Sequence, residues 1–181
     1  MRVYRGFSQQ APGPTALTIG NFDGVHLGHR SLLARIKTAS EGGHLLPTVL
    51  TFEPHPREFF APATAPTRLS TLREKLERIA GEGIDTIYVG RFNAAFAAWT
   101  AEEFIERILV NTLRVKRLII GDDFCFGAAR RGNFALLREA GKHFGFSLEA
   151  MPSVTLSGER ASSSAVRNAL AEGRIEHAAA L

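Results

Sequence analysis

The sequence predicts an α/β protein, a doubly wound parallel sheet with helices on both faces. Two observations predict this class. Short apolar runs rich in β-branched residues alternate along the chain with longer segments in which apolar residues recur every three or four positions. Helix-capping residues or glycines separate the two kinds of segment. Such alternation is typical of βαβ units, whose strands lie parallel in one sheet.

The predicted strands are the short apolar runs. The second of them, Leu-Leu-Pro-Thr-Val-Leu-Thr-Phe-Glu, follows the first helix and therefore pairs in parallel with the first. We expect strands at residues 16–19, 45–53, 85–90, 116–121 and 146–152, and an edge strand at residues 2–7.

The predicted helices follow from apolar spacing and capping signals. Thr71 and Thr100 each precede a glutamate by three residues, which is the spacing of a capping box. Residues 59–66 contain Pro62 and Pro66, so we expect a non-helical loop there, mobile or able to fold over a substrate. We expect helices that end near residues 42–43, begin at 71 and at 100, span 133–144 and open at 162.

Length and composition indicate one globular domain. With 181 residues, 45% of them hydrophobic, the chain can bury a core, and we treat residues 1–181 as one domain. No apolar run is long enough to span a membrane and no signal-peptide segment is present, so we expect a cytoplasmic protein without a membrane partner. The single Cys125 excludes an internal disulfide and a cysteine-rich zinc site.

The charge balance favours a small anionic partner. The net charge is +4, and the isoelectric point is near 9.7. The basic residues are spread out rather than gathered into a stripe, which disfavours nucleic acid. Nucleotides therefore fit better than nucleic acid, and composition leaves the oligomeric state open.

Residues 20–29, Gly-Asn-Phe-Asp-Gly-Val-His-Leu-Gly-His, connect the first strand to the first helix. In an open α/β sheet, ligands bind at this edge, and the helix start offers free N–H groups to an anion. His26 and His29 are three residues apart and can converge on one phosphate, while Gly28 lacks a Cβ and leaves room for it. The structural alternative is a pair of packed histidines.

Three further segments combine polar residues with the ends of predicted strands or helices. Residues 53–56, Glu-Pro-His-Pro, end the second strand, and residues 121–127, Gly-Asp-Asp-Phe-Cys-Phe-Gly, end the strand at 116–121. Adjacent carboxylates at such a position can hold hydrated Mg²⁺. Residues 162–167, Ser-Ser-Ser-Ala-Val-Arg, place hydroxyls and an arginine at a helix start, where a pyrophosphate can bind. A rigid loop, a turn and an ordinary N-cap are the respective structural alternatives.

Together these four motifs resemble the adenylyltransferase domain of bacterial bifunctional riboflavin kinase/FAD synthetases, in the nucleotidyltransferase superfamily. The resemblance covers nearly the whole chain. It implies a Rossmann-like nucleotidyltransferase fold and the substrates ATP and FMN, with Mg²⁺. In that family a riboflavin kinase domain follows the segment that matches residues 172–181, and we expect no kinase domain within this chain.

The resemblance also implies roles for individual residues. We expect His26 and His29 to donate to the ATP phosphates, Arg167 to hold the pyrophosphate, and Asp123 to lie near the nucleotide and Mg²⁺. We expect the remaining motif residues to bind the nucleotide or the flavin: Gly20, Asn21, Phe22, Asp23, Gly24, Gly28, Glu53, Pro54, His55, Pro56, Phe124, Phe126, Ser162, Ser163 and Ser164.

The implied reaction is adenylyl transfer from ATP to FMN, which gives FAD and pyrophosphate. Two alternatives stay open. A nucleotidyltransferase for another phosphorylated acceptor would share the histidine motif and the serine-rich end, though not the segments at 53–56 and 121–127. A flavin- or nucleotide-binding domain that is inactive without its kinase partner domain would bind FMN and form no product.

Overall fold

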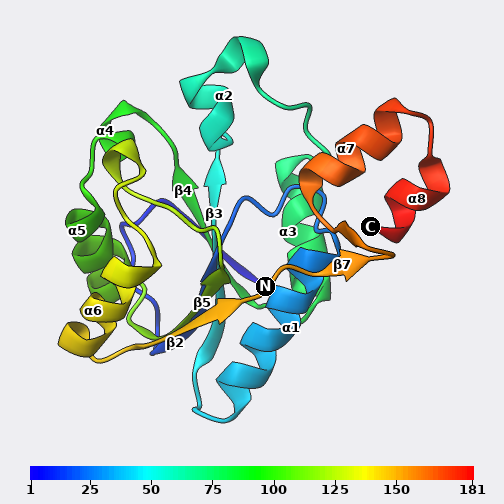
Figure 1. The fold of residues 1–181 in the computed structure, drawn as a ribbon. Coiled ribbons are helices and arrows are strands. Elements are labelled where there is room, and N and C mark those ends of the chain that lie inside the picture. The colour runs from blue at the N-terminus through cyan, green and yellow to red at the C-terminus, as the bar shows by residue number, and fades with distance from the viewer.

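The protein, described here for residues 1–181 by a computed structural model, is built on a six-stranded sheet in which all paired strands are parallel (Figure 1). The strand order is β1-β4-β3-β2-β5-β6. The predicted α/β class and the edge strand near the N-terminus are confirmed. The strands are β1 (Arg2–Arg5), β2 (Thr15–Ile19), β3 (Leu46–Glu53), β4 (Thr86–Arg91), β5 (Val115–Gly121) and β6 (Ser147–Met151).

Helices cover both faces of this sheet and bury two separate cores (Figure 1). On one face lie α1 (Leu27–Glu41) and α3 (Leu72–Gly81), whose buried residues repeat with helical spacing. The other face is covered by α4 (Ala94–Ala97), α5 (Ala101–Glu103), the π-helical segment η2 (Phe104–Thr112) and α6 (Phe134–Phe144). None of these helices is long and apolar enough to cross a membrane.

The remaining elements lie beyond the carboxyl ends of the strands or beside them. A two-stranded hairpin, β7 (Thr155–Leu156) with β8 (Glu159–Arg160), precedes α7 (Ser163–Ala171) and α8 (Ile175–Ala180). Figure 1 shows α7 and α8 next to the N-terminal end of α1, where Leu181 and Ala165 form a small core with Leu27. The start of α7 is thereby held against the turn that follows β2.

The segment after β3 differs from the sequence prediction. We expected no helix around Phe59 and Phe60, but Pro56–Phe60 forms α2 and Pro62–Thr64 forms the short 3₁₀ turn η1. Both begin with a proline, which suits the first position of a helix because its missing N–H would have no partner there. Proline therefore starts these turns instead of preventing them.

The topology brings two strand ends together. The chain runs from β2 outward through β3 to β4, then crosses to β5 on the other side of β2 and continues to β6. The order of the sheet thus reverses between β2 and β5, and ligands of open α/β sheets bind at such a switch point. The turn after β2 and the segment after β5 meet at this place.

Candidate active site

A cavity of about 390 Å³ opens at the carboxyl ends of β2 and β5. Its walls come from the turn before α1, the start of α2, the segment after β5, the hairpin region and the start of α7. Most predicted site residues line it: Gly20, Asn21, Phe22, His26, Gly28, His29, His55, Asp123, Phe124, Ser162, Ser163, Ser164 and Arg167. The four motifs therefore converge on one cavity.

Six predicted site residues do not line this cavity, namely Asp23, Gly24, Glu53, Pro54, Pro56 and Phe126. Phe126 is buried in the core and stacks behind Phe124, with ring centroids 5.6 Å apart. Gly24 has a φ of +79°, and a Cβ there would lie 2.9 Å from Leu69, so this glycine serves the turn. Asp23 and Glu53 bind arginines instead, as described below.

His26 and His29 stack on each other at the N-terminal end of α1. Their ring centroids are 3.7 Å apart, and Phe22 packs against His29 at 4.8 Å. His26 is the N-cap of α1, and the Nδ1 atoms of both rings are buried without a hydrogen-bond partner. A Cβ at Gly28 would lie 3.1 Å from His26, so Gly28 leaves space for this ring as well as for a ligand.

Both imidazoles are neutral at pH 7. Burial, followed by the nearby cations Arg160 and Arg167, lowers the pKa of His26 to about 4. Burial, with His26 and Lys75 adding to it, holds the pKa of His29 well below its usual range. A neutral imidazole keeps one N–H to donate to an anion, so the pair can hold a phosphate without itself being charged.

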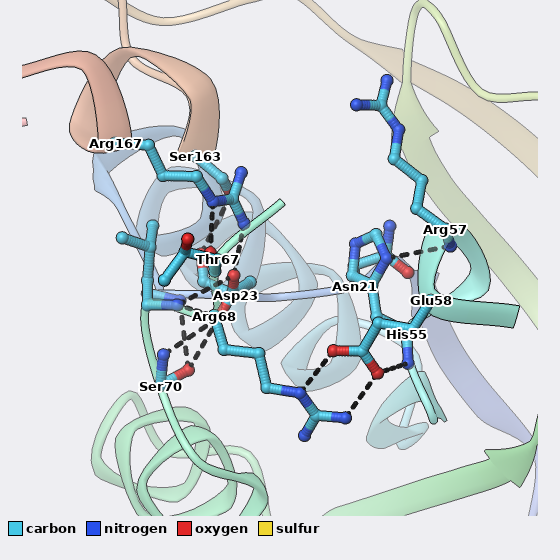
Figure 2. A network of polar contacts seen from close by, with 12 residues as sticks. Asn21, Asp23, His55, Arg57, Glu58, Thr67, Arg68, Ser70, Ser163 and Arg167 are labelled. Atoms are coloured by element: carbon cyan, nitrogen blue, oxygen red, sulfur yellow. Dashed lines mark hydrogen bonds and ion pairs between the residues drawn. The ribbon is translucent and has the colours of Figure 1, made fainter. Parts of the chain in front are cut away.

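Asp23 joins the turn after β2 to two other segments (Figure 2). Its buried carboxylate accepts hydrogen bonds from the backbone N–H groups of Leu69 and Ser70 and forms an ion pair with Arg167. Arg167 also donates through Nε to the carbonyl oxygen of Thr67 at 2.6 Å. Asp23 is therefore saturated by protein donors, and Arg167 keeps only Nη1 without a protein partner.

The serines at the start of α7 differ in their availability. Ser162 caps the helix by accepting from the N–H of Ala165, and Ser163 donates to the carbonyl oxygen of Asp23 at 2.9 Å. Ser164 is exposed and lines the cavity. This arrangement leaves one free hydroxyl and the helix N-terminus facing the cavity.

A second polar cluster surrounds α2 (Figure 2). Arg68 binds Glu58 through two nitrogens, at 2.5 and 2.6 Å, and Glu53 at 2.6 Å. Glu58 accepts from the backbone N–H of His55, and the Nδ1 of His55 accepts from the N–H of Arg57. Burial lowers the pKa of His55, so this ring is neutral at pH 7 with its proton on Nε2.

The two carboxylates at the end of β5 are too few to bind a metal ion alone, but they could hold one together with substrate phosphates and waters. Asp122 and Asp123 both line the cavity, and Asp123 forms an ion pair with Arg160 at 2.9 Å. No group of three or more His, Cys, Asp or Glu side chains is arranged to hold a metal ion. Mg²⁺ needs only one or two carboxylates when substrate phosphates and waters complete its shell, and this pair meets that requirement.

Sequence reasoning missed two arginines of the cavity wall, Arg57 and Arg160. Arg160 lies in the two-residue strand β8, where no periodic pattern exists to indicate it. Arg160 stands two residues before the serine-rich helix start, and this proximity was the one sequence feature that could have indicated its place in the cavity wall. Arg57 follows Pro56 in α2, the helix that the sequence did not predict.

A family model described as FAD synthetase matches residues 8–165. The chain belongs to the FAD synthetase family. Bifunctional riboflavin kinase/FMN adenylyltransferases are similar to it: that of Escherichia coli (strain K12) is 46% identical over all of this chain, and that of Haemophilus influenzae is 47% identical over 89% of it.

The chain spans 59% of the Escherichia coli protein and 52% of the Haemophilus influenzae protein. Solved structures show the same fold at lower identity. A macrolide-efflux protein from Streptococcus pneumoniae matches with a TM-score of 0.81 at 22% identity, over 98% of this chain and 60% of that one. A pantoate-beta-alanine ligase from Francisella tularensis matches with a TM-score of 0.57 at 14% identity, over 93% of this chain and 73% of that one.

Proposed function

We propose that this chain is an FMN adenylyltransferase, which transfers the adenylyl group of ATP to FMN and gives FAD and pyrophosphate. The observation that carries the proposal is the stacked pair of neutral histidines, His26 and His29, in one cavity with Arg160 and Arg167. Membership of the FAD synthetase family and the names of the similar curated proteins support it. The proposal covers adenylyl transfer alone.

ATP binds with its phosphates between the start of α1 and the start of α7. His26 and His29 donate to them, with His29 nearest the charge that develops. Arg167, Ser164 and the N-terminus of α7 hold the pyrophosphate, and Arg160 adds a second cation from the hairpin. Asp123 would hold Mg²⁺ together with the phosphates, and the ion would neutralise part of their charge.

FMN binds on the side of the cavity that α2 and the segment after β5 form. His55, Pro66 and Phe124 line this side, which offers apolar contact and one imidazole N–H. Phe59 and Phe60 on α2 are exposed and pack edge-on against Phe92, at 5.7 and 5.5 Å. Aromatic surface of this kind suits a flat heterocycle.

The reaction needs no covalent enzyme intermediate. An FMN phosphate oxygen attacks the α-phosphorus of ATP, a new P–O bond forms, and the bond from the α-phosphorus to the bridging oxygen breaks so that pyrophosphate leaves. The attacking oxygen is already anionic at pH 7, because the second pKa of a phosphate monoester is about 6, so no general base is required. The chain contributes positioning and stabilisation of negative charge.

An acceptor panel tests this proposal. The chain is incubated with ATP and Mg²⁺ and with FMN, riboflavin, pantetheine phosphate or glycerol phosphate, and the products are separated by chromatography. We expect FAD from FMN and no adenylylated product from the other acceptors. Product from another phosphorylated acceptor in place of FMN would overturn the assignment, as would tight FMN binding without any FAD.

A further inference from the structure

Arg68 connects two acidic residues that come from different elements. It lies in the connector between α2 and α3, and it binds Glu53 at the end of β3 and Glu58 within α2. The two bonds to Glu58 are parallel and form a bidentate pair, the strongest geometry available to arginine. Arg68 thereby ties α2 to the strand that precedes it.

The helix that Arg68 holds has little else to hold it. α2 has only five residues, and none of them is buried. Burial of apolar surface therefore does not fix its orientation, as it does for longer helices. The polar contacts of Glu58 and the edge-on contacts of Phe59 and Phe60 with Phe92 help to hold it.

These contacts lead directly to His55. Glu58 Oε2 accepts from Arg68 at 2.6 Å and from the backbone N–H of His55 at 3.2 Å. The Nδ1 atom of His55 accepts from the N–H of Arg57 at 3.1 Å, which leaves the ring proton on Nε2. The orientation and tautomer of a cavity-lining imidazole thus depend on the start of α2.

Arg68 is itself held from both sides. The carbonyl oxygen of Thr67 accepts from Arg167, and the N–H of Leu69 donates to Asp23 at 3.0 Å. Figure 2 shows this run of contacts from Arg167 through Asp23 and the connector, with Arg68 reaching from it to Glu58. The guanidinium therefore projects from a backbone that Arg167 on α7 and Asp23 in the turn before α1 hold in place.

We propose that Arg68 is a positioning residue for the FMN half of the site: by holding Glu53 and Glu58 it fixes α2, and with it the orientation and tautomer of His55. The inference rests on the proposed FMN adenylyltransferase function. Arg68 also neutralises Glu53 and Glu58, two carboxylates close in sequence to His55, and these charges would otherwise repel an anionic ligand such as FMN. Loss of the Arg68 side chain therefore weakens FMN binding in two ways, because α2 and His55 are no longer held and two carboxylates are no longer neutralised. The histidines and arginines that face ATP keep their contacts.

The test compares three variants of the full 181-residue chain. Arg68→Gln removes the charge and the bidentate pair, and Arg68→Lys keeps the charge alone. Arg73→Gln is the matched control, because Arg73 is exposed and pairs only with Glu77 one turn away on α3. KM for FMN, KM for ATP and kcat are measured for each variant. FMN affinity is measured separately by fluorescence, with a non-hydrolysable ATP analogue present.

We expect Arg68→Gln to raise KM and the dissociation constant for FMN about ten-fold, with KM for ATP within about two-fold of the parent. For Arg68→Lys we expect FMN values between those of the parent and those of Arg68→Gln. Arg73→Gln should match the parent. Equal losses for ATP and FMN, or no loss, would overturn the inference. If Arg68→Gln fails to fold, the comparison of Arg68→Lys with Arg73→Gln decides in the same way.

The two proposals fail differently. A parent chain that binds FMN but makes no FAD overturns the proposed function, and the fluorescence affinities still decide whether Arg68 positions the flavin side. A parent chain that makes FAD with no change in Arg68→Gln overturns only the role of Arg68. A parent chain that neither binds FMN nor makes FAD overturns both.

Discussion

At the scale of single residues, the stacked imidazoles show how two uncharged side chains can serve the highly charged substrate that we propose, ATP. Burial keeps His26 and His29 neutral at pH 7, and the cations Arg160 and Arg167 add to that effect on His26. Neutral rings avoid the cost of two buried charges 3.7 Å apart. In the proposed reaction they still offer N–H donors where the phosphate charge increases.

Replacement of His29 tests this role. We expect His29→Ala to lower kcat for FAD formation roughly 10²–10³-fold, the cost typical of one lost donor to developing oxyanion charge. Steady-state kinetics measures it. His143→Ala, an exposed histidine on α6, is the control and keeps the parental rate. A rate for His29→Ala within a few-fold of the parent would show that His29 is no phosphate donor.

The depressed pKa values also predict how stability depends on pH. Folding lowers the pKa of His26 from 6.5 to about 4 and that of His29 in the same direction. As the pH falls below about 6.5, the unfolded chain binds protons that the folded chain does not, so stability is full above that pH and is lost below it.

We therefore expect the free energy of unfolding of the parent, measured by urea denaturation, to be lower at pH 5.5 than at pH 7. His26→Gln removes one titrating group, so the difference between the two pH values shrinks. The window stays above the range in which carboxylates with lowered pKa values, such as Glu58 and Glu149, take up protons. An unchanged difference in His26→Gln would contradict the assignment.

At the scale of elements, Asp23 is the point where three segments join. It receives donors from the connector before α3 and from Arg167 on α7, while its own backbone belongs to the turn before α1. The side chains of Arg167 and Asp23 are only 18% and 6% exposed, so this ion pair is not a surface pair. Loss of one partner leaves a largely buried charge unpaired.

For this reason we expect Asp23→Asn to destabilise the protein by about 3 kcal/mol, measured by urea denaturation. Glu77→Gln removes an exposed ion pair with Arg73 and serves as the control, with an expected change of no more than about 0.5 kcal/mol. A similar small change for Asp23→Asn would mean that the three segments hold together without its carboxylate.

At the scale of the whole molecule, the sequence predicted the sheet because its strands and long helices are periodic. β3 and β5 each bury a continuous run, residues 48–52 and 118–120, made of apolar residues with two threonines, and α1 and α3 bury residues at helical spacing. α2 escaped prediction because none of its five residues is buried, so it has no apolar period to detect. Pro62 was the other reason to expect a loop, although it stands at the first position of the 3₁₀ turn η1, as Pro56 does in α2.

The candidate site was predictable where a motif follows a strand. His26, Asp123 and Ser164 line the cavity because the sheet topology brings their motifs together. The partners of Asp23 were not predictable, since they lie 46 and more residues away in the connector and on α7. Arg160 was missed because the two-residue strand that carries it has no pattern of its own.

The cavity lies at the switch point between β2 and β5. We propose that the adenylyl group passes there from ATP to FMN directly. The most direct measurement incubates the chain with FMN and ATP labelled at the α-phosphorus, then follows the label in FAD and in acid-precipitated protein. We predict that the label appears in FAD, in step with pyrophosphate release, and never in the protein. Label bound to the protein, or label that stays in ATP, would contradict the account.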